Sequence, residues 1–224
     1  MKIGNKIFIL LLAICQNGWA QGFADLNFEH PIPPLPTGSG NISVANAIPG
    51  WTAYFGASAQ TAIGYDTVSL GGEAVILEDT NAPGGVPLPI QGSYSVLLEG
   101  SALAVATTAS IGQTGTIPVT AQSLTFWGVL AANVQGQNLQ LSFNNQALSF
   151  TAISNALNYT VYGANISPFA GQTGQLLFTV PVQGIALLDN IQFSSLPVPE
   201  PSTFALTALG ALFIGFNRWR HSSR

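Results

Sequence analysis

The chain is short of charge, and its few basic residues are confined to its two ends. Only 6 % of the 224 residues are charged, against roughly 25 % in a typical soluble domain. Between Gln21 and Val198 there is no lysine or arginine, and there are eight acidic residues: Asp25, Glu29, Asp66, Glu73, Glu78, Asp79, Glu99 and Asp189. Because Lys and Arg supply most of the affinity for phosphates, we expect no nucleic-acid partner and no electrostatic docking on anionic lipid.

Side chains that carry catalysis are also scarce. Cys15 is the only cysteine, and His30 is the only histidine between Gln21 and Val198. A Ser-His-Asp triad would have to use His30, and no Gly-x-Ser-x-Gly pattern is present. Carboxylate pairs for glycoside hydrolysis are conceivable among Asp66, Glu73, Glu78 and Glu99, but their spacing does not test this. The sequence therefore predicts a protein that is not an enzyme and that requires no cofactor.

Residues 1–20 have the layout of a secretory signal peptide. Lys2 and Lys6 precede an apolar run, Ile7 to Ile14, and the small residues Gly18 and Ala20 follow it. The run is shorter than the roughly 18 apolar residues of a membrane anchor, which favours cleavage after Ala20. Lipidation of Cys15 is disfavoured because the bulky Ile14 precedes it. The mature chain would then have no cysteine and no disulfide.

The C-terminal end joins "VPEPST" to the apolar run Thr203 to Phe216 and a basic tail, at residues 198–224. This stretch resembles the sorting signal of bacterial PEP-CTERM proteins. The resemblance implies Pro199, Glu200 and Pro201 as the recognition triplet, a membrane helix over 203–219 with arginines in the cytoplasm, and an exosortase-type processing enzyme as partner. The protein would be exported through the inner membrane, anchored by the helix, and then placed at the surface or outside the cell. The alternative is a surface loop leading into a buried helix.

Residues 21–196 predict an all-β domain. Short segments with period-two alternation are separated by Gly, Asn and Pro turns, and no helical periodicity is evident outside the ends. Nine such segments favour an antiparallel jelly-roll β-sandwich: 74–78, 94–99, 102–108, 123–130, 139–143, 147–153, 159–163, 175–180 and 185–193. The earlier part is looser, with Pro/Gly-rich loops at 30–41 and 81–89.

Three patches of this domain, "ADLNFEHP", "IPGW" and "LLDNIQF", resemble galactose-binding-like jelly rolls, including carbohydrate-binding modules. In that family an opening glutamate and a closing aspartate often meet at a structural calcium ion. The matching positions are Glu29 and Asp189, so the resemblance implies a possible calcium site there. Two separately solvated acids are the alternative. Glu78 and Asp79 would point to opposite faces of a strand, and a solvated loop start is expected for them.

Aromatic side chains supply candidate faces for sugar rings, and we single out Trp51, Tyr54 and Tyr65. Trp127, within "LTFWGVL", is expected in the sandwich core, and Trp51 is also more often a core residue at such a position. Two functional hypotheses follow. The first is a non-catalytic protein of the cell surface or the exopolysaccharide matrix, and the second is a carbohydrate-binding module with one defined glycan.

Overall fold

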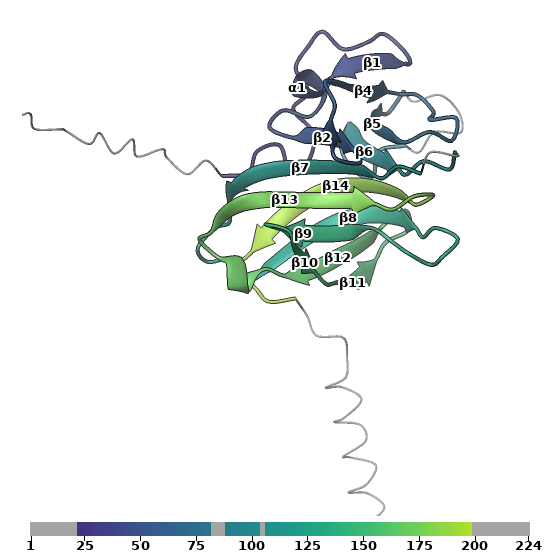
Figure 1. The fold of residues 1–224 in the computed structure, drawn as a ribbon. Coiled ribbons are helices and arrows are strands. Elements are labelled where there is room, and N and C mark those ends of the chain that lie inside the picture. Colours follow the sequence, from purple (N-terminus) through teal and green to yellow (C-terminus); the bar gives the residue numbers. More distant parts are fainter. Residues whose placement is uncertain (1–21, 82–87, 104–105, 199–224) are drawn as a thin grey trace, which may run out of the picture.

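The computed structural model describes residues 22–81, 88–103 and 106–198, which fold into a two-layer β-sandwich (Figure 1). The first sheet has eight strands, in the spatial order β1 (Gly40–Ser43), β4 (Ala62–Tyr65), β5 (Ala74–Asp79), β6 (Tyr94–Glu99), β14 (Ile185–Ser194), β8 (Ser123–Ala131), β12 (Thr160–Asn165) and β11 (Phe150–Asn155). The second has six, in the order β10 (Gln146–Leu148), β9 (Gln140–Phe143), β13 (Thr173–Val180), β7 (Ala109–Thr116), β2 (Thr52–Phe55) and β3 (Ser58–Ala59). The all-β class is thus confirmed.

Helical structure in the described residues is limited to α1 (Val44–Ala47) and the 3-10 turn η1 (Ser167–Phe169). No helix among these residues has the length and apolarity needed to cross a membrane. The predicted signal peptide (1–20), the sorting triplet and the predicted membrane helix (203–219) lie outside the described residues.

The core lies between the sheets and follows from the alternation of the strands. On β13 the inward positions Leu176, Phe178 and Val180 are buried, while the residues between them are half-buried. Phe178 meets Phe126 of the opposite sheet edge-on, with ring centroids 5.4 Å apart. A strand with one face on the core alternates in this way because successive side chains point to opposite faces.

The sequence misplaced one strand. The stretch 102–108 was expected to be a strand, but its described residues are not; the strand of this region is β7, Ala109–Thr116. It was missed because its glycines and polar residues weaken the apolar pattern. Glycine nevertheless fits position 112, because a Cβ there would lie only 3.0 Å from a methyl carbon of Leu177 and would crowd that side chain. β1 to β4 also occupy the part that was expected to be loose.

The strand pairings are antiparallel with one exception among the described strands. β4 runs parallel to β5, with Gly64 beside Ile76 and Tyr65 beside Leu77. The chain crosses over between them, and Asp66 follows β4 with a positive φ of 44°. The sandwich therefore departs locally from a purely antiparallel plan, at the place where several acidic residues gather.

Candidate functional site

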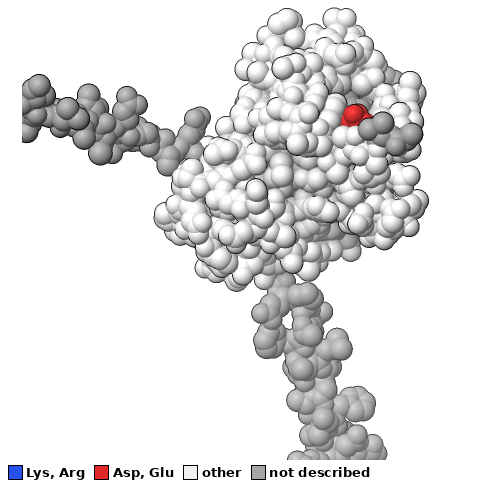
Figure 2. All heavy atoms as spheres, viewed as in Figure 1, with Lys and Arg blue, Asp and Glu red and all other residues white. Residues whose placement is uncertain are grey.

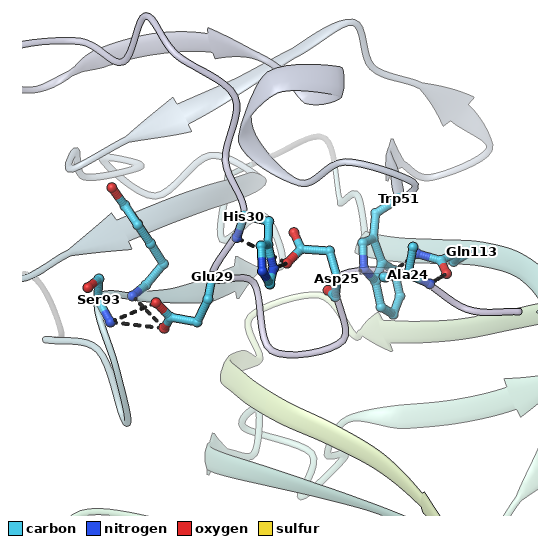
Figure 3. Close-up of polar contacts among 8 residues, drawn as sticks. Ala24, Asp25, Glu29, His30, Trp51, Ser93 and Gln113 are labelled. Atoms are coloured by element: carbon cyan, nitrogen blue, oxygen red, sulfur yellow. Dashed lines mark hydrogen bonds and ion pairs between the residues drawn. The ribbon is translucent and has the colours of Figure 1, made fainter.

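The segment that opens the body, residues 22–32, is fixed to both sheets (Figure 3). The Gln113 side chain of β7 accepts a hydrogen bond from the Ala24 N–H and donates one to the Ala24 carbonyl at 2.9 Å. The Trp51 indole N–H donates to the Asp25 carbonyl at 3.1 Å. Phe28 is fully buried, with its ring 5.6 Å from that of Trp51. These contacts set the position of Glu29, the residue that follows Phe28.

Glu29 binds the turn that leads into β6. Its carboxylate accepts the N–H of Ser93 at 2.9 Å and the N–H of Tyr94 at 3.1 Å (Figure 3). Gly92 lies directly against it with a φ of +67°, and a Cβ at Gly92 would lie 2.1 Å from Glu29 Oε1. Only glycine combines this backbone conformation with so close an approach.

Asp189 of β14 binds the same turn. Its Oδ2 accepts the N–H of Gln91 at 3.0 Å and the hydroxyl of Ser95 at 2.9 Å. Burial raises the pKa of this carboxyl to about 6, although the hydrogen bonds from Ser95, Gln91 and Asn190 act to lower it. The negative charge of Glu29 also raises this pKa, as expected of two neighbouring carboxylates.

The structure thus brings Glu29 and Asp189, the residues predicted to share a calcium ion, to one five-residue segment, 91–95. It does so through N–H and O–H donors, which reach Glu29 from Ser93 and Tyr94 and reach Asp189 from Gln91 and Ser95. Within the described ranges, no three His, Cys, Asp or Glu side chains gather in a way that could hold a metal ion. Calcium at this position stays an untested prediction.

A second group of acids lies at the end of β5, where the sequence led us to expect a solvated loop. Instead Glu78 and Asp79 are both within the strand, with exposed fractions of 0 % and 9 %. Asp79 faces the core and accepts the Tyr65 hydroxyl at 2.7 Å, while its own N–H donates to Asp66 Oδ1 at 2.8 Å. The two side chains do point to opposite faces, as expected, but neither is solvated.

Glu78 is buried on the outer face of the first sheet, and neither of its carboxylate oxygens has a hydrogen-bond partner. Burial raises its pKa to about 8, and the negative charges of Asp66, Glu99 and Asp79 add to the effect. At neutral pH this carboxyl therefore carries a proton, which is how a buried acid avoids an uncompensated charge.

The three aromatic residues predicted to contact a ligand lie mainly in the interior. Trp51 and Tyr65 have exposed fractions of 4 % and 3 %, so neither presents a ring face to solvent. Tyr54 is half-buried on β2, and its hydroxyl accepts a hydrogen bond from Gln175 at 3.2 Å. The structure does not bring the three rings together as one exposed platform.

An outer-face aromatic pair was missed by the sequence reasoning. Trp127 was expected in the core, but Leu124 and Phe126 take the inward positions of β8 and are fully buried, which turns Trp127 to the outer face. There its ring stacks on Tyr159, with centroids 4.5 Å apart and planes 13° apart. Strict alternation from Leu124 would have predicted this orientation.

Beside this pair lies a cavity of about 370 Å³ on the same sheet face. Val129, two residues after Trp127, and Asn158, the neighbour of Tyr159, both line it. The rest of its wall is apolar and comes from β6, β14, Ala131 of β8 and the segment Leu88–Ile90. The aromatic pair and this cavity form one surface, which we call the Trp127 face.

Comparisons with known proteins identify the C-terminal end. A model of the PEP-CTERM protein-sorting motif matches residues 197–220. The chain therefore carries a PEP-CTERM sorting signal, which marks an exported protein that an exosortase sorts. No curated protein matches the chain.

Several solved structures are similar to this chain at low sequence identity. A Stig cyclase from Fischerella sp. TAU has 15 % identity and a TM-score of 0.47, and the match covers 80 % of this chain and 98 % of that one. The carbohydrate-binding module TmCBM61 in complex with β-1,4-galactotriose has 12 % identity and a TM-score of 0.39, with coverages of 78 % and 97 %. The cleaved adhesin domain of Lys-gingipain from Porphyromonas gingivalis has 14 % identity and a TM-score of 0.37, with coverages of 70 % and 97 %.

Because Gly92 lies against Glu29, we predict that alanine destabilises the protein more at position 92 than at position 136. Gly92→Ala should lower the free energy of unfolding by about 2–4 kcal/mol, because it adds backbone strain and displaces a carboxylate that accepts backbone N–H groups. Gly136→Ala is the matched control: Gly136 also has a positive φ, of +74°, but nothing lies within 4 Å of its added Cβ. Its cost should be only the backbone strain, about 1–2 kcal/mol. Equal losses of unfolding free energy in the two variants, measured by urea denaturation, would contradict the contact between Gly92 and Glu29.

From the raised pKa of Glu78 we predict that the free energy of unfolding falls as the pH rises. The unfolded chain releases this proton near pH 4.5 and the folded chain near pH 8, so between these values the folded state binds more protons and stability falls with pH. The raised pKa values of Asp66 and Asp189, both about 6, act in the same direction up to about pH 7. The loss between pH 7 and 8 therefore belongs mainly to Glu78, with a limiting slope of about 1.4 kcal/mol per pH unit.

Urea denaturation of the purified protein at several pH values measures this loss. Glu78→Gln should flatten most of the profile between pH 7 and 8, because the amide cannot ionise. Glu73→Gln, which changes a half-buried glutamate just before the same strand, should leave the slope in place. A wild-type profile that is already flat in this window would show that Glu78 ionises normally.

Proposed function

We propose that the protein is an exported, non-catalytic component of the cell surface or the exopolysaccharide matrix, sorted by an exosortase. The observation that carries the proposal is the sorting motif, which begins at residue 197, where the described body ends. The membrane helix over 203–219 would hold the protein until it is processed, and release would free the body, residues 21–196.

The surface of the body supports a role among neutral polymers. Among the described residues no aspartate or glutamate is fully exposed, and His30 is the only exposed ionisable side chain. Figure 2 shows this face as almost wholly uncharged, with one small acidic patch. A surface covered by Ser, Thr, Asn and Gln neither attracts nor repels a charged polymer strongly, and it offers hydrogen bonds to hydroxyl groups.

Intact-mass analysis of the mature protein from hosts with and without the exosortase tests this proposal. With the enzyme, we expect a species that starts at Gln21, ends near residues 199–201, and appears in the surface or extracellular fraction. Replacing Pro199, Glu200 and Pro201 by alanine should leave the tail uncut and the protein in the membrane fraction. An identical mass and location in both hosts would contradict sorting by this enzyme. Release of reducing sugar from polysaccharides would contradict the non-catalytic assignment.

A second candidate function, binding of one extracellular glycan, is favoured by the Trp127 face. Aromatic rings beside an apolar cavity, with an amide at its edge, provide both stacking surface and a hydrogen-bonding group. The absence of Lys and Arg from the body favours a neutral glycan over an anionic one.

Titration calorimetry against neutral polysaccharides tests this second function. Trp127→Ala should weaken binding at least tenfold, which corresponds to about 1.4 kcal/mol. Tyr54→Phe is the control, because it keeps a half-buried ring on the other sheet and removes only its hydroxyl. Unchanged affinity in Trp127→Ala, or a loss only in Tyr54→Phe, would remove the Trp127 face from glycan binding.

A further inference from the structure

The end of the sandwich from which the chain leaves is built by three segments that hydrogen-bond to one another. The Ile117 N–H donates to the Gln172 carbonyl at 3.0 Å, and the Ile166 N–H donates to the Gln122 carbonyl at 3.1 Å. The Gln122 N–H in turn donates to the Ser194 carbonyl at 2.8 Å. We call this surface, made of residues 117–123, 166–172 and 194–198, the exit end.

The chain is held against the body up to the last residue described. The Ser123 hydroxyl donates to the Leu196 carbonyl at 2.7 Å. Val198 packs on β12 beside Gly163, where an added Cβ would lie only 3.1 Å from a Val198 methyl carbon. Residue 199 therefore follows directly on a docked residue, and no free linker separates the folded body from the sorting triplet.

The exit end carries no charge and presents apolar side chains to solvent. None of its three segments contains an acidic or basic residue or a histidine. Val119 and Leu196 have exposed fractions of 80 % and 70 %. In Figure 2 the acidic atoms of this view lie at the upper right, away from the lower end where the chain leaves.

The length of the remaining chain limits how far the exit end can stand from a membrane. Four residues, 199–202, separate Val198 from Thr203, where the apolar run begins. Five steps of extended chain span at most about 18 Å. One headgroup layer is roughly 5–8 Å thick, so about 13 Å at most would remain between the body and the headgroups. The apolar run is short for a bilayer, which draws the body closer.

We propose that, before the tail is cut, the exit end rests on the lipid headgroup layer and forms a membrane-apposed surface of the body. This inference depends on the proposed retention by the C-terminal helix. Val119 and Leu196 contact the interfacial region, and the lack of acidic residues removes repulsion from an anionic leaflet. The contact is imposed by the short tether and not by attraction to charged lipid, so it also forms on uncharged lipid.

Site-specific fluorescence on the full-length protein in phosphatidylcholine vesicles tests the contact. In a Cys15→Ser background, Val119→Cys and, separately, Val134→Cys receive an environment-sensitive dye. Val134 is the matched control because it is 81 % exposed and follows β8, whose first residue, Ser123, lies at the exit end. β8 is nine residues long, so its two ends are about 26 Å apart. Lipid carrying a nitroxide on its headgroup should quench the dye at 119 several-fold more than the dye at 134.

A variant with a longer tether distinguishes contact of the exit end with the headgroups from mere attachment of the protein to the vesicle. Twenty Gly/Ser residues inserted between Val198 and Pro199 have an r.m.s. length of about 25 Å and should reduce quenching at 119 to the level at 134. Flotation of the vesicles checks retention independently. Protein that does not float would overturn both retention and the contact. Protein that floats but shows equal quenching at 119 and 134 would overturn the contact alone.

Discussion

Every acid in the body must be accommodated without a single lysine or arginine, and this constraint shapes the structure. Glu29 and Asp189 take backbone N–H groups and a serine hydroxyl as partners, and Asp79 takes the Tyr65 hydroxyl. Glu78 has no partner, and burial keeps it protonated at neutral pH. An exposed acid would need a basic side chain as its partner, and the body has none. Backbone N–H groups and the hydroxyls of Ser95 and Tyr65 serve as partners instead, and these donors lie within the fold. The acids are thus drawn inward, and the surface becomes nearly uncharged.

The same constraint gives the turn at 91–95 its structural importance. Glu29 of the opening segment and Asp189 of the closing strand both accept hydrogen bonds from this turn. Gly92 allows the approach because it has neither a Cβ nor a penalty for a positive φ. The opening segment also meets the closing strand directly, because the Ile191 N–H of β14 donates to the Leu26 carbonyl at 2.8 Å and the rings of Phe23 and Phe193 lie 5.2 Å apart. The two carboxylates add the turn at 91–95 to this junction.

The sequence predicted strands where apolar residues were dense and missed the one that glycines interrupt. The segments 175–180 and 185–193 were found with small errors at their ends, although only β13 alternates strictly and β14 buries four successive residues, 186–189. β7 was missed because Gly112 and Gly115 leave gaps in its pattern, although those gaps are required by neighbouring side chains. The resemblance did place Glu29 and Asp189 together. Their partners come from residues 91–95, which no local pattern could have linked to them, because 64 to 98 residues separate the hydrogen-bonded groups.

The two surfaces that we propose, the Trp127 face and the exit end, share strand β8 and are therefore coupled by geometry. Trp127 is four residues beyond Ser123, about 13 Å along the strand. With the exit end on the headgroups, the aromatic pair would stand near the membrane surface, facing sideways, where only a thin polymer could approach it. Cutting at 199–201 would remove this restriction and would keep every described strand, because the last of them, β14, ends at Ser194. Release would then convert a hindered binding face into an open one, so that sorting by the tail would also control when the face meets its glycan.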